Sequence, residues 1–301
     1  MKTNILDTSI SGHTNLLCLL GHPVEHSISP RMHTIAANHL GLDYAYLAFD
    51  ITEEQLPTAV NALRLFGCRG WNLTMPLKRT IIPLLDELSE ASALAGSVNT
   101  VVNNQGRLIG HTTDGIGFIR ALEDRGCSVK GTKMTILGAG GVATPMIAQA
   151  AMDGVREISV FKRKNATFAE TESFVHKITQ QTSCRVTVYD MADDATLRRE
   201  IGESQILANA TNVGMGDDTT SLVNPSMFHS DLVVFDAIYH PAKTTLLRDA
   251  EAAGATIING EGQLLFQGAA SFALWTGKEM PIDIIKETCF PNLMPNGGMN
   301  P

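Results

Sequence analysis

Residues 133–153 read KMTILGAGGVATPMIAQAAMD, and they contain a short apolar run, a glycine cluster and a helical pattern in that order. The apolar run suits a buried parallel strand, and Gly138, Gly140 and Ala143 then give the G-x-G-x-x-G/A spacing of a dinucleotide-binding turn. Such glycines permit a tight turn and a close approach of the backbone to a pyrophosphate, which the N–H groups at the start of the helix attract. The stretch therefore predicts a nucleotide site, with an ordinary glycine-rich turn as the alternative.

The segment after the next predicted strand, 158–161, indicates which nucleotide is bound. An NAD site usually has an acidic residue about 20 residues beyond the first glycine, whereas cations accommodate the 2′-phosphate of NADP. Residues 162–165 read KRKN, and Arg163 can hold a phosphate through two hydrogen bonds. The sequence thus favours NADP, although Asn165 can bond a plain ribose and NAD stays open. The candidate cofactor residues are Gly138, Ala139, Gly140, Gly141, Val142, Ala143, Lys162, Arg163, Lys164, Asn165, Thr211 and Gly260.

The composition is that of a globular protein. The 301 residues, 44% of them hydrophobic and 18% charged, suffice for two domains of about 100–200 residues each. A net charge of −8 argues against a nucleic-acid partner held by a global basic field. The five cysteines form no C-x-x-C or metal-ligand spacing, so we expect reduced thiols and no metal. Without a run of 18 apolar residues or a signal-peptide pattern, we expect a cytoplasmic protein without membrane contact.

The N-terminal part alternates between strand and helix patterns. Residues 16–20, 44–49 and 70–73 read as strands, and the segments between them as helices, which favours a mainly parallel sheet. We also expect a strand over 97–102 that contains Asn99. The tail from Pro291 is rich in Pro, Gly and Asn, which predicts disorder.

Several polar residues lie at the ends of these patterns. Ser27 and Ser29 precede a helix, where they can cap it or bind an anion. Lys78 follows the third strand and suits either a general acid/base or a solvated surface. Asp114 by itself favours a helix cap, and Gln267 on its helix favours solvent exposure. These residues acquire a function only when they are considered together.

Seven motifs in order resemble those of the shikimate dehydrogenase family, including its quinate/shikimate dehydrogenase branch, over nearly the whole chain. They are HSISP at 26–30, NLTMPLK at 72–78, GSVNT at 96–100, TDG at 113–115, GAGGVA at 138–143, NATNVGM at 209–215 and YHP at 239–241.

The resemblance implies an α/β fold with two domains and a cleft between them. A Rossmann-type doubly wound nucleotide domain is expected over 115–254. A smaller α/β substrate domain is expected over 1–114, completed by 255–290, with a disordered tail over 291–301.

The resemblance further implies an NADP-dependent oxidoreductase that reduces 3-dehydroshikimate to shikimate in aromatic amino-acid biosynthesis. Lys78 and Asp114 become the expected catalytic pair that assists proton transfer. The implied substrate residues are Ser27, Ser29, Thr74, Asn99, Tyr239 and Gln267.

Two departures from the family pattern leave the substrate open. Thr112 replaces a common Asn, and Gln263 replaces a usual Met, so an extra polar group near the ring allows quinate as a second substrate. A quinate/shikimate dehydrogenase that uses NAD or NADP is one alternative, and a catalytically silent nucleotide-sensing protein is another. Relatives occur as monomers and dimers, and either state is expected.

Overall fold

The computed structural model describes residues 10–294. Within them the chain forms two compact units, the first made of 10–93, 97–113 and 268–294 and the second of 94–96 and 114–267. Helix α10, Glu261–Thr276, contributes its first part to the second unit and the rest to the first.

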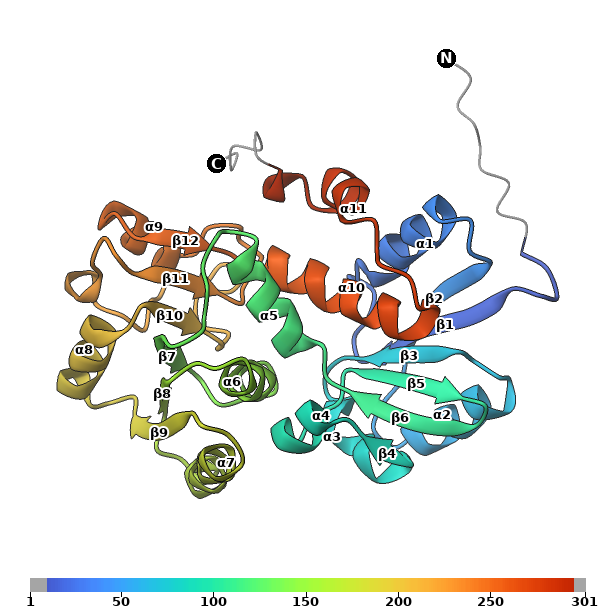
Figure 1. The fold of residues 1–301 in the computed structure, drawn as a ribbon, viewed down its shortest axis with the longest axis horizontal. Coiled ribbons are helices and arrows are strands. Elements are labelled where there is room, and N and C mark those ends of the chain that lie inside the picture. Colours follow the sequence, from blue (N-terminus) through green and yellow to red (C-terminus); the bar gives the residue numbers. More distant parts are fainter. Residues whose placement is uncertain (1–9, 295–301) are drawn as a thin grey trace, which may run out of the picture. The chain divides into compact units, whose positions relative to one another are not determined.

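The first unit contains a mixed six-stranded sheet in the order β2-β1-β3-β5-β6-β4 (Figure 1). The pairs β2-β1, β1-β3 and β6-β4 are parallel, and β5 runs antiparallel to both of its neighbours. The strands are β1 Asn15–Gly21, β2 Tyr44–Asp50, β3 Gly70–Leu73, β4 Glu87–Leu88, β5 Thr100–Asn104 and β6 Arg107–His111. The helices are α1 Ser29–His39, α2 Leu56–Leu65, α3 Leu77–Thr80, η1 Ile82–Leu84, α4 Glu90–Ala95, α11 Ile282–Cys289 and η3 Pro291–Leu293.

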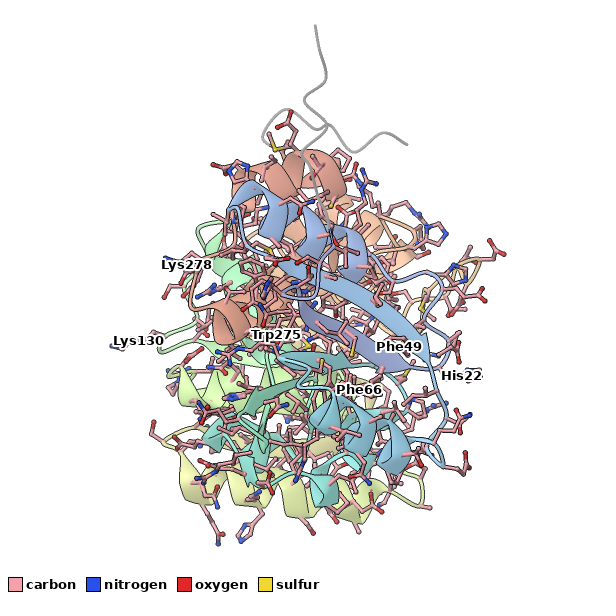
Figure 2. All side chains as sticks on the ribbon, turned by 90° about the vertical axis from the view of Figure 1, so that its right-hand side faces the viewer. His22, Phe49, Phe66, Lys130, Trp275 and Lys278 are labelled. Carbon is pink, nitrogen blue, oxygen red and sulfur yellow. The ribbon has the colours of Figure 1, made fainter. Side chains whose placement is uncertain are left out.

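Strand β1 is buried on both faces, which explains why its sequence is a continuous apolar run. Cys18 and Leu20 belong to a core cluster that α2 completes, whereas Leu17 and Leu19 pack in a second cluster with Trp275. The neighbouring strand β2 lies at the edge of the sheet. The side chain of its Phe49, labelled in Figure 2, is exposed to solvent.

The second unit contains a six-stranded parallel sheet in the order β12-β11-β10-β7-β8-β9. Numbered from β7, this is the doubly wound order 3-2-1-4-5-6, and it confirms the predicted Rossmann-type fold. The strands are β7 Lys133–Leu137, β8 Glu157–Lys162, β9 Arg185–Asp190, β10 Ile206–Asn209, β11 Val233–Asp236 and β12 Thr256–Ile258. The other elements are α5 Asp114–Glu123, α6 Ala143–Met152, α7 Phe168–Gln181, α8 Asp194–Glu203, η2 Pro225–Met227 and α9 Thr245–Ala252.

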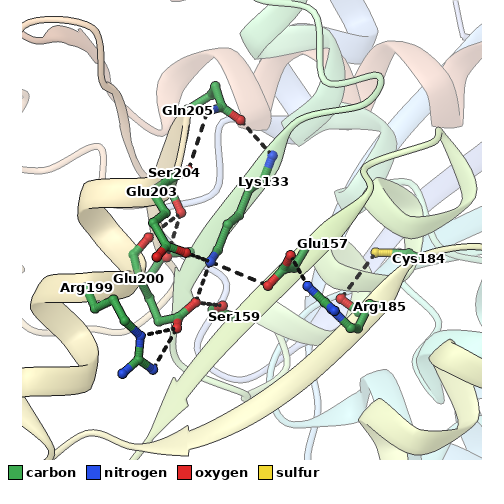
Figure 3. Close-up of polar contacts among 11 residues, drawn as sticks. Lys133, Glu157, Ser159, Cys184, Arg185, Arg199, Glu200, Glu203, Ser204 and Gln205 are labelled. Carbon is green, nitrogen blue, oxygen red and sulfur yellow. Dashed lines mark hydrogen bonds and ion pairs between the residues drawn. The ribbon is translucent and has the colours of Figure 1, made fainter.

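A buried ion cluster lies where β7 begins (Figure 3). The Nζ of Lys133 is 2.6 Å from Glu203, 2.7 Å from Glu200 and 3.4 Å from Glu157. The side chain of Lys133 is only 5% exposed. Strands β7 and β8 and helix α8 are therefore joined by charge as well as by packing.

Three features differ from the expectations drawn from sequence. Strand β12 pairs with β11, so residues 256–258 belong to the second unit, whereas the first was expected to resume at 255. Strand β5 begins at Thr100, so Asn99 precedes the strand. The expected disordered tail contains the short helix η3, and residues 295–301 lie outside the described residues.

In the stretch from 10 to 294, no helix combines the length and the apolar content that crossing a bilayer requires.

Candidate functional site

The glycine turn after β7 has the conformation that a dinucleotide-binding turn requires. Gly138 has φ +107°, a region that side chains rarely adopt, and a Cβ there would lie 3.0 Å from the carbonyl oxygen of Ala210. The N–H of Gly138 donates to the carbonyl of Phe161 at 2.8 Å. The turn is thereby fixed between β8 and the loop after β10, at the point where the strand order reverses.

The outer side of this turn has room for a ligand. A Cβ added at Gly140 or Gly141 would meet nothing within 4 Å, and both residues are exposed. Helix α6 begins at Ala143, and Val142 before it supplies no side-chain cap to the first N–H groups. Ala143 is fully buried, as expected for close packing of the helix. An open backbone beside an uncapped helix start fits the pyrophosphate of a dinucleotide.

The basic residues after β8 divide into two groups. The Nζ of Lys162 donates to the Thr167 hydroxyl at 2.8 Å, and the Asn165 side-chain oxygen accepts from the Thr167 N–H at 3.2 Å. These two residues therefore hold the turn itself. Arg163 and Lys164 are exposed and have no hydrogen bond or ion pair with any residue of the described chain. They are the cations that can receive a phosphate.

Two buried side chains, Asn209 and Asp236, fix the loops after β10 and β11. The Asn209 amide donates to Asp236 at 3.0 Å, and its oxygen accepts from the hydroxyl of Thr211 at 2.7 Å. Asp236 also accepts from the Thr244 hydroxyl at 2.6 Å and from the N–H of Ile238 at 3.1 Å. Burial raises the pKa of Asp236, although these bonds act in the opposite direction. Sequence reasoning missed both roles, and the available signal was a polar residue that ends a buried strand.

Gly260 has a structural reason to lack a side chain. A Cβ there would lie 2.2 Å from the carbonyl oxygen of Ala237, and the N–H of Gly260 donates to the carbonyl of Ile238 at 3.0 Å. The start of α10 thus packs directly on the loop after β11. Contact between Gly260 and a cofactor stays a prediction.

The first unit attaches three predicted substrate-site residues to its two central strands, where β3 ends and β5 begins. The carbonyl of Asn99 accepts from the N–H of Leu73, next to Thr74, at 2.8 Å. Lys78 lies in α3, half-buried, and its carbonyl accepts from the N–H of Val98 at 2.9 Å. Thr74, Lys78 and Asn99 are therefore attached to the same pair of strands.

The side chain of Asn99 also forms hydrogen bonds with Thr113, the residue that precedes Asp114. Its oxygen accepts from the N–H of Thr113 at 2.7 Å, and its amide donates to the Thr113 hydroxyl at 2.9 Å. Both residues are buried.

Ser27 and Ser29 lie at the start of α1. The N–H of Ser29 donates to the Ser27 hydroxyl oxygen at 3.2 Å, so Ser27 takes up one of the N–H groups at this helix start. Ser29 is 6% exposed and Ser27 is half-buried. The N-cap position itself is Ile28, which has no side-chain cap hydrogen bond, and anion binding by the two serines stays a prediction.

The remaining predicted residues belong to the second unit. Asp114 begins α5, and its carbonyl accepts from the side-chain amide of Gln263 at 3.1 Å. Helix α5 also packs closely on α10, because a Cβ at Gly117 would lie 2.9 Å from the Cβ of Gln267. Tyr239 follows β11 and is 53% exposed. Gln263, expected near the substrate ring, thus has a backbone partner.

Over the residues that the structure describes, no group of three or more His, Cys, Asp or Glu side chains is arranged to hold a metal ion. All five cysteines are free thiols.

Comparison with known proteins gives consistent results along the chain. Residues 19–101 match the model of the shikimate dehydrogenase substrate binding domain, and residues 260–290 match that of the shikimate 5′-dehydrogenase C-terminal domain. A protein of Listeria innocua named shikimate dehydrogenase (NADP(+)) is 49% identical over 290 residues, which are 96% of this chain and 100% of that protein.

Two solved structures are similar over both units. Shikimate 5-dehydrogenase from Listeria monocytogenes, in complex with shikimate and NAD, has a TM-score of 0.90 at 48% identity. The similarity covers 92% of this chain and 97% of the chain in that structure. Quinate dehydrogenase from Corynebacterium glutamicum, in complex with NAD, has a TM-score of 0.82 at 29% identity and covers 91% and 98%. The chain therefore belongs to the shikimate dehydrogenase family.

Proposed function

We propose that this chain is an NADP-dependent shikimate dehydrogenase, which reversibly reduces 3-dehydroshikimate to shikimate in aromatic amino-acid biosynthesis. The observation that carries the proposal is the 49% identity to a shikimate dehydrogenase (NADP(+)) across 96% of the chain, which includes both the glycine turn and the polar residues of the first unit. A small-molecule substrate and NADP, with NAD as an alternative, are the ligands. A homodimer or a monomer, in the cytoplasm, stays a prediction.

The substrate is a ring with one carboxylate and several hydroxyls, and the first unit offers matching groups. Ser27 and Ser29 bind the carboxylate through their hydroxyls. Thr74 and Asn99, which flank the central strands β3 and β5 of this unit, bind ring hydroxyls. From the second unit, Gln267 and Tyr239 contribute an amide and a phenol.

The reduction needs a hydride on the carbonyl carbon and a proton on the carbonyl oxygen. NADPH supplies the hydride when bound and leaves as NADP⁺. The ammonium of Lys78 polarises the carbonyl and donates the proton as the C=O π bond opens, so one C–H and one O–H bond form. Asp114 orients the lysine and a substrate hydroxyl. In the reverse direction neutral Lys78 accepts the proton.

Replacing Lys78 tests this assignment. Proton transfer by a positioned side chain contributes about 10²–10⁴ in rate, so Lys78→Ala should lose that factor in kcat. Binding of NADP, whose proposed contacts lie in the second unit, should be unchanged. Steady-state kinetics with 3-dehydroshikimate and NADPH, together with calorimetric titration of NADP, measure the two quantities.

Arg79→Ala is the matched control, because Arg79 is the next residue of α3 and is exposed. It should keep near-normal turnover. A Lys78→Ala variant with near-normal turnover would remove Lys78 from the reaction.

Quinate is the second substrate to be assayed, because the quinate dehydrogenase structure covers 91% of this chain. The wild-type protein should be assayed with shikimate and quinate, each with NAD and NADP. A quinate rate at background would exclude the dual activity, whereas a quinate rate above that of shikimate would reverse the proposed preference.

A further inference from the structure

Tyr46 has a phenol ring that is held rigidly inside the first unit. The residue lies in the middle of β2 and is 5% exposed. Its ring stacks on that of His33, with the centroids 4.6 Å apart and the planes within 7° of each other. Trp275 packs against both rings, at 6.2 Å from Tyr46 and 5.3 Å from His33. The position of the phenol oxygen is therefore set by packing on more than one side.

The phenol selects one orientation of the Asn72 amide. Its O–H donates to the side-chain oxygen of Asn72 at 2.7 Å. The amide nitrogen then points toward three acceptors, the Asn99 carbonyl at 3.1 Å, the Thr100 hydroxyl at 3.1 Å and the Ser271 hydroxyl at 3.2 Å. A flipped amide would place N–H groups against the phenol and its oxygen against a carbonyl, so the phenol determines which groups Asn72 can hold.

The hydrogen bonds continue from Asn72 to the proposed substrate site. Ser271 is 2.7 Å from the Thr100 hydroxyl and 3.1 Å from the Thr113 hydroxyl. Thr113 in turn is bonded through its N–H and its hydroxyl to the side chain of Asn99. The network thus ends at a proposed substrate residue and at the residue before Asp114.

The phenol keeps the proton that it donates to Asn72. Burial raises the pKa of Tyr46 well above its ordinary value, Cys18 acts in the same direction, and Ser29 opposes them less strongly. The phenol is therefore protonated at all physiological pH values.

From this geometry we infer that Tyr46 is a positioning residue for substrate binding, which acts through Asn72 on Asn99. The inference rests on the proposed function, because it requires that Asn99 binds the substrate. It assigns Tyr46 no contact with substrate or cofactor.

The variant Tyr46→Phe tests the inference, because it keeps the stacked ring and removes only the hydroxyl. We expect the KM for shikimate to rise about three- to tenfold, which corresponds to one hydrogen bond of ordinary net strength. The KM for NADP should stay within twofold, because the nucleotide residues lie in the second unit. A general destabilisation of the protein would not raise the KM for shikimate while leaving the KM for NADP unchanged.

A double-mutant comparison tests the route through Asn72. Asn72→Ala removes the amide that Tyr46 orients, so adding Tyr46→Phe to it should change the shikimate KM little further. Fully multiplicative effects of the two substitutions would overturn the route through Asn72. If Asn72→Ala fails to fold, Asn72→Asp serves instead, because its carboxylate accepts from the phenol and cannot donate to the Asn99 carbonyl.

Tyr44→Phe is the matched control on the same strand and the same face. Tyr44 is half-buried, and its hydroxyl has no hydrogen-bond partner in the described chain, so both KM values should stay unchanged. An unchanged shikimate KM in Tyr46→Phe would overturn the inference.

Failure of the proposed function has a different signature, because the wild-type protein would then show no turnover with shikimate. Hydrogen exchange still decides the positioning role in that case. The N–H of Thr113, held by Asn99, should exchange faster in Tyr46→Phe than in wild type or Tyr44→Phe, and equal rates would overturn the role.

Discussion

Arg163 and Asn165 are two residues apart, yet they differ in what their side chains are free to do. The side-chain oxygen of Asn165 accepts hydrogen bonds from the hydroxyl and the N–H of Thr167. The side chain of Arg163 has no hydrogen-bond or ion-pair partner in the described chain. This difference favours Arg163 as the residue that separates NADP from NAD.

Arg163→Ala should raise the KM for NADPH about tenfold or more and leave the KM for NADH unchanged, because only NADPH carries the 2′-phosphate that a guanidinium clamps. Kinetics with both cofactors measure the ratio. Lys130→Ala, at an exposed lysine of the same unit, is the control and should change neither value. Equal losses with both cofactors would contradict a 2′-phosphate contact.

The roles of some single residues could be predicted from the sequence, and those of others could not. The glycine turn was predictable because its spacing follows from the geometry of a pyrophosphate site. Lys78 and Asp114 were ambiguous locally and were singled out only by the family resemblance. The roles of Tyr46 and Asn209 were not predictable, because each depends on a partner 26 or 27 residues away in the chain.

Among the elements, β7 shows how a strand can be fixed at both ends by different means. Its C-terminal end leads into the glycine turn, and its N-terminal end begins with the buried Lys133. Burial lowers the pKa of Lys133, but the hydrogen bonds that its ammonium donates to Glu200 and Glu203 outweigh the effect of burial, so the pKa is raised.

Lys133→Met should lower the free energy of unfolding by about 3 kcal/mol, because it leaves buried carboxylates without their main cation. Urea unfolding at pH 7 measures the loss. Lys243→Met removes a lysine from the more exposed pair with Glu251 and should cost less than about 1 kcal/mol. Equal losses in the two variants would show that the cluster contributes no more than a surface pair.

The same comparison has a defined pH dependence. Burial raises the pKa of Glu200, but hydrogen bonds from Lys133, Ser159 and Arg199 together lower it by more, so the net shift is downward. A carboxylate with a lowered pKa in the folded state stabilises above its unfolded pKa, and that contribution is lost as the pH falls through the folded value. The advantage of wild type over Lys133→Met should therefore shrink below about pH 4.

The elements themselves were largely predictable where the pattern was long and regular. The predicted strand over 44–49 agrees closely with β2. The two-residue strand β4 was not predicted, since its pairing with β6 comes from tertiary contact.

For the whole molecule, the fold class was predictable and the limits of the units were not. Alternating strands and helices with one glycine turn specify a doubly wound sheet, and the observed strand order agrees. The second boundary falls inside α10, and a continuous helix carries no sequence signal for a change of unit.

Ligand binding to the whole chain separates the enzyme from a silent nucleotide sensor. NADP at 100 times its Kd should stabilise the folded protein by about 2.7 kcal/mol and raise its Tm. Shikimate should raise the Tm as well, because it also binds only the folded state. A thermal-shift titration measures both, and a shift with NADP but with neither shikimate nor quinate would favour the sensor.

The bond between Asn209 and Asp236 has a consequence for the exchange of loops between relatives. Each side chain forms a hydrogen bond with its own loop and also with the other side chain. Replacing only one of the two loops would therefore place a foreign loop against the native side chain that forms the other half of this hydrogen bond. Chimeras that move residues 209–215 and 236–241 as a single cassette should remain well folded more often than those that move either segment alone.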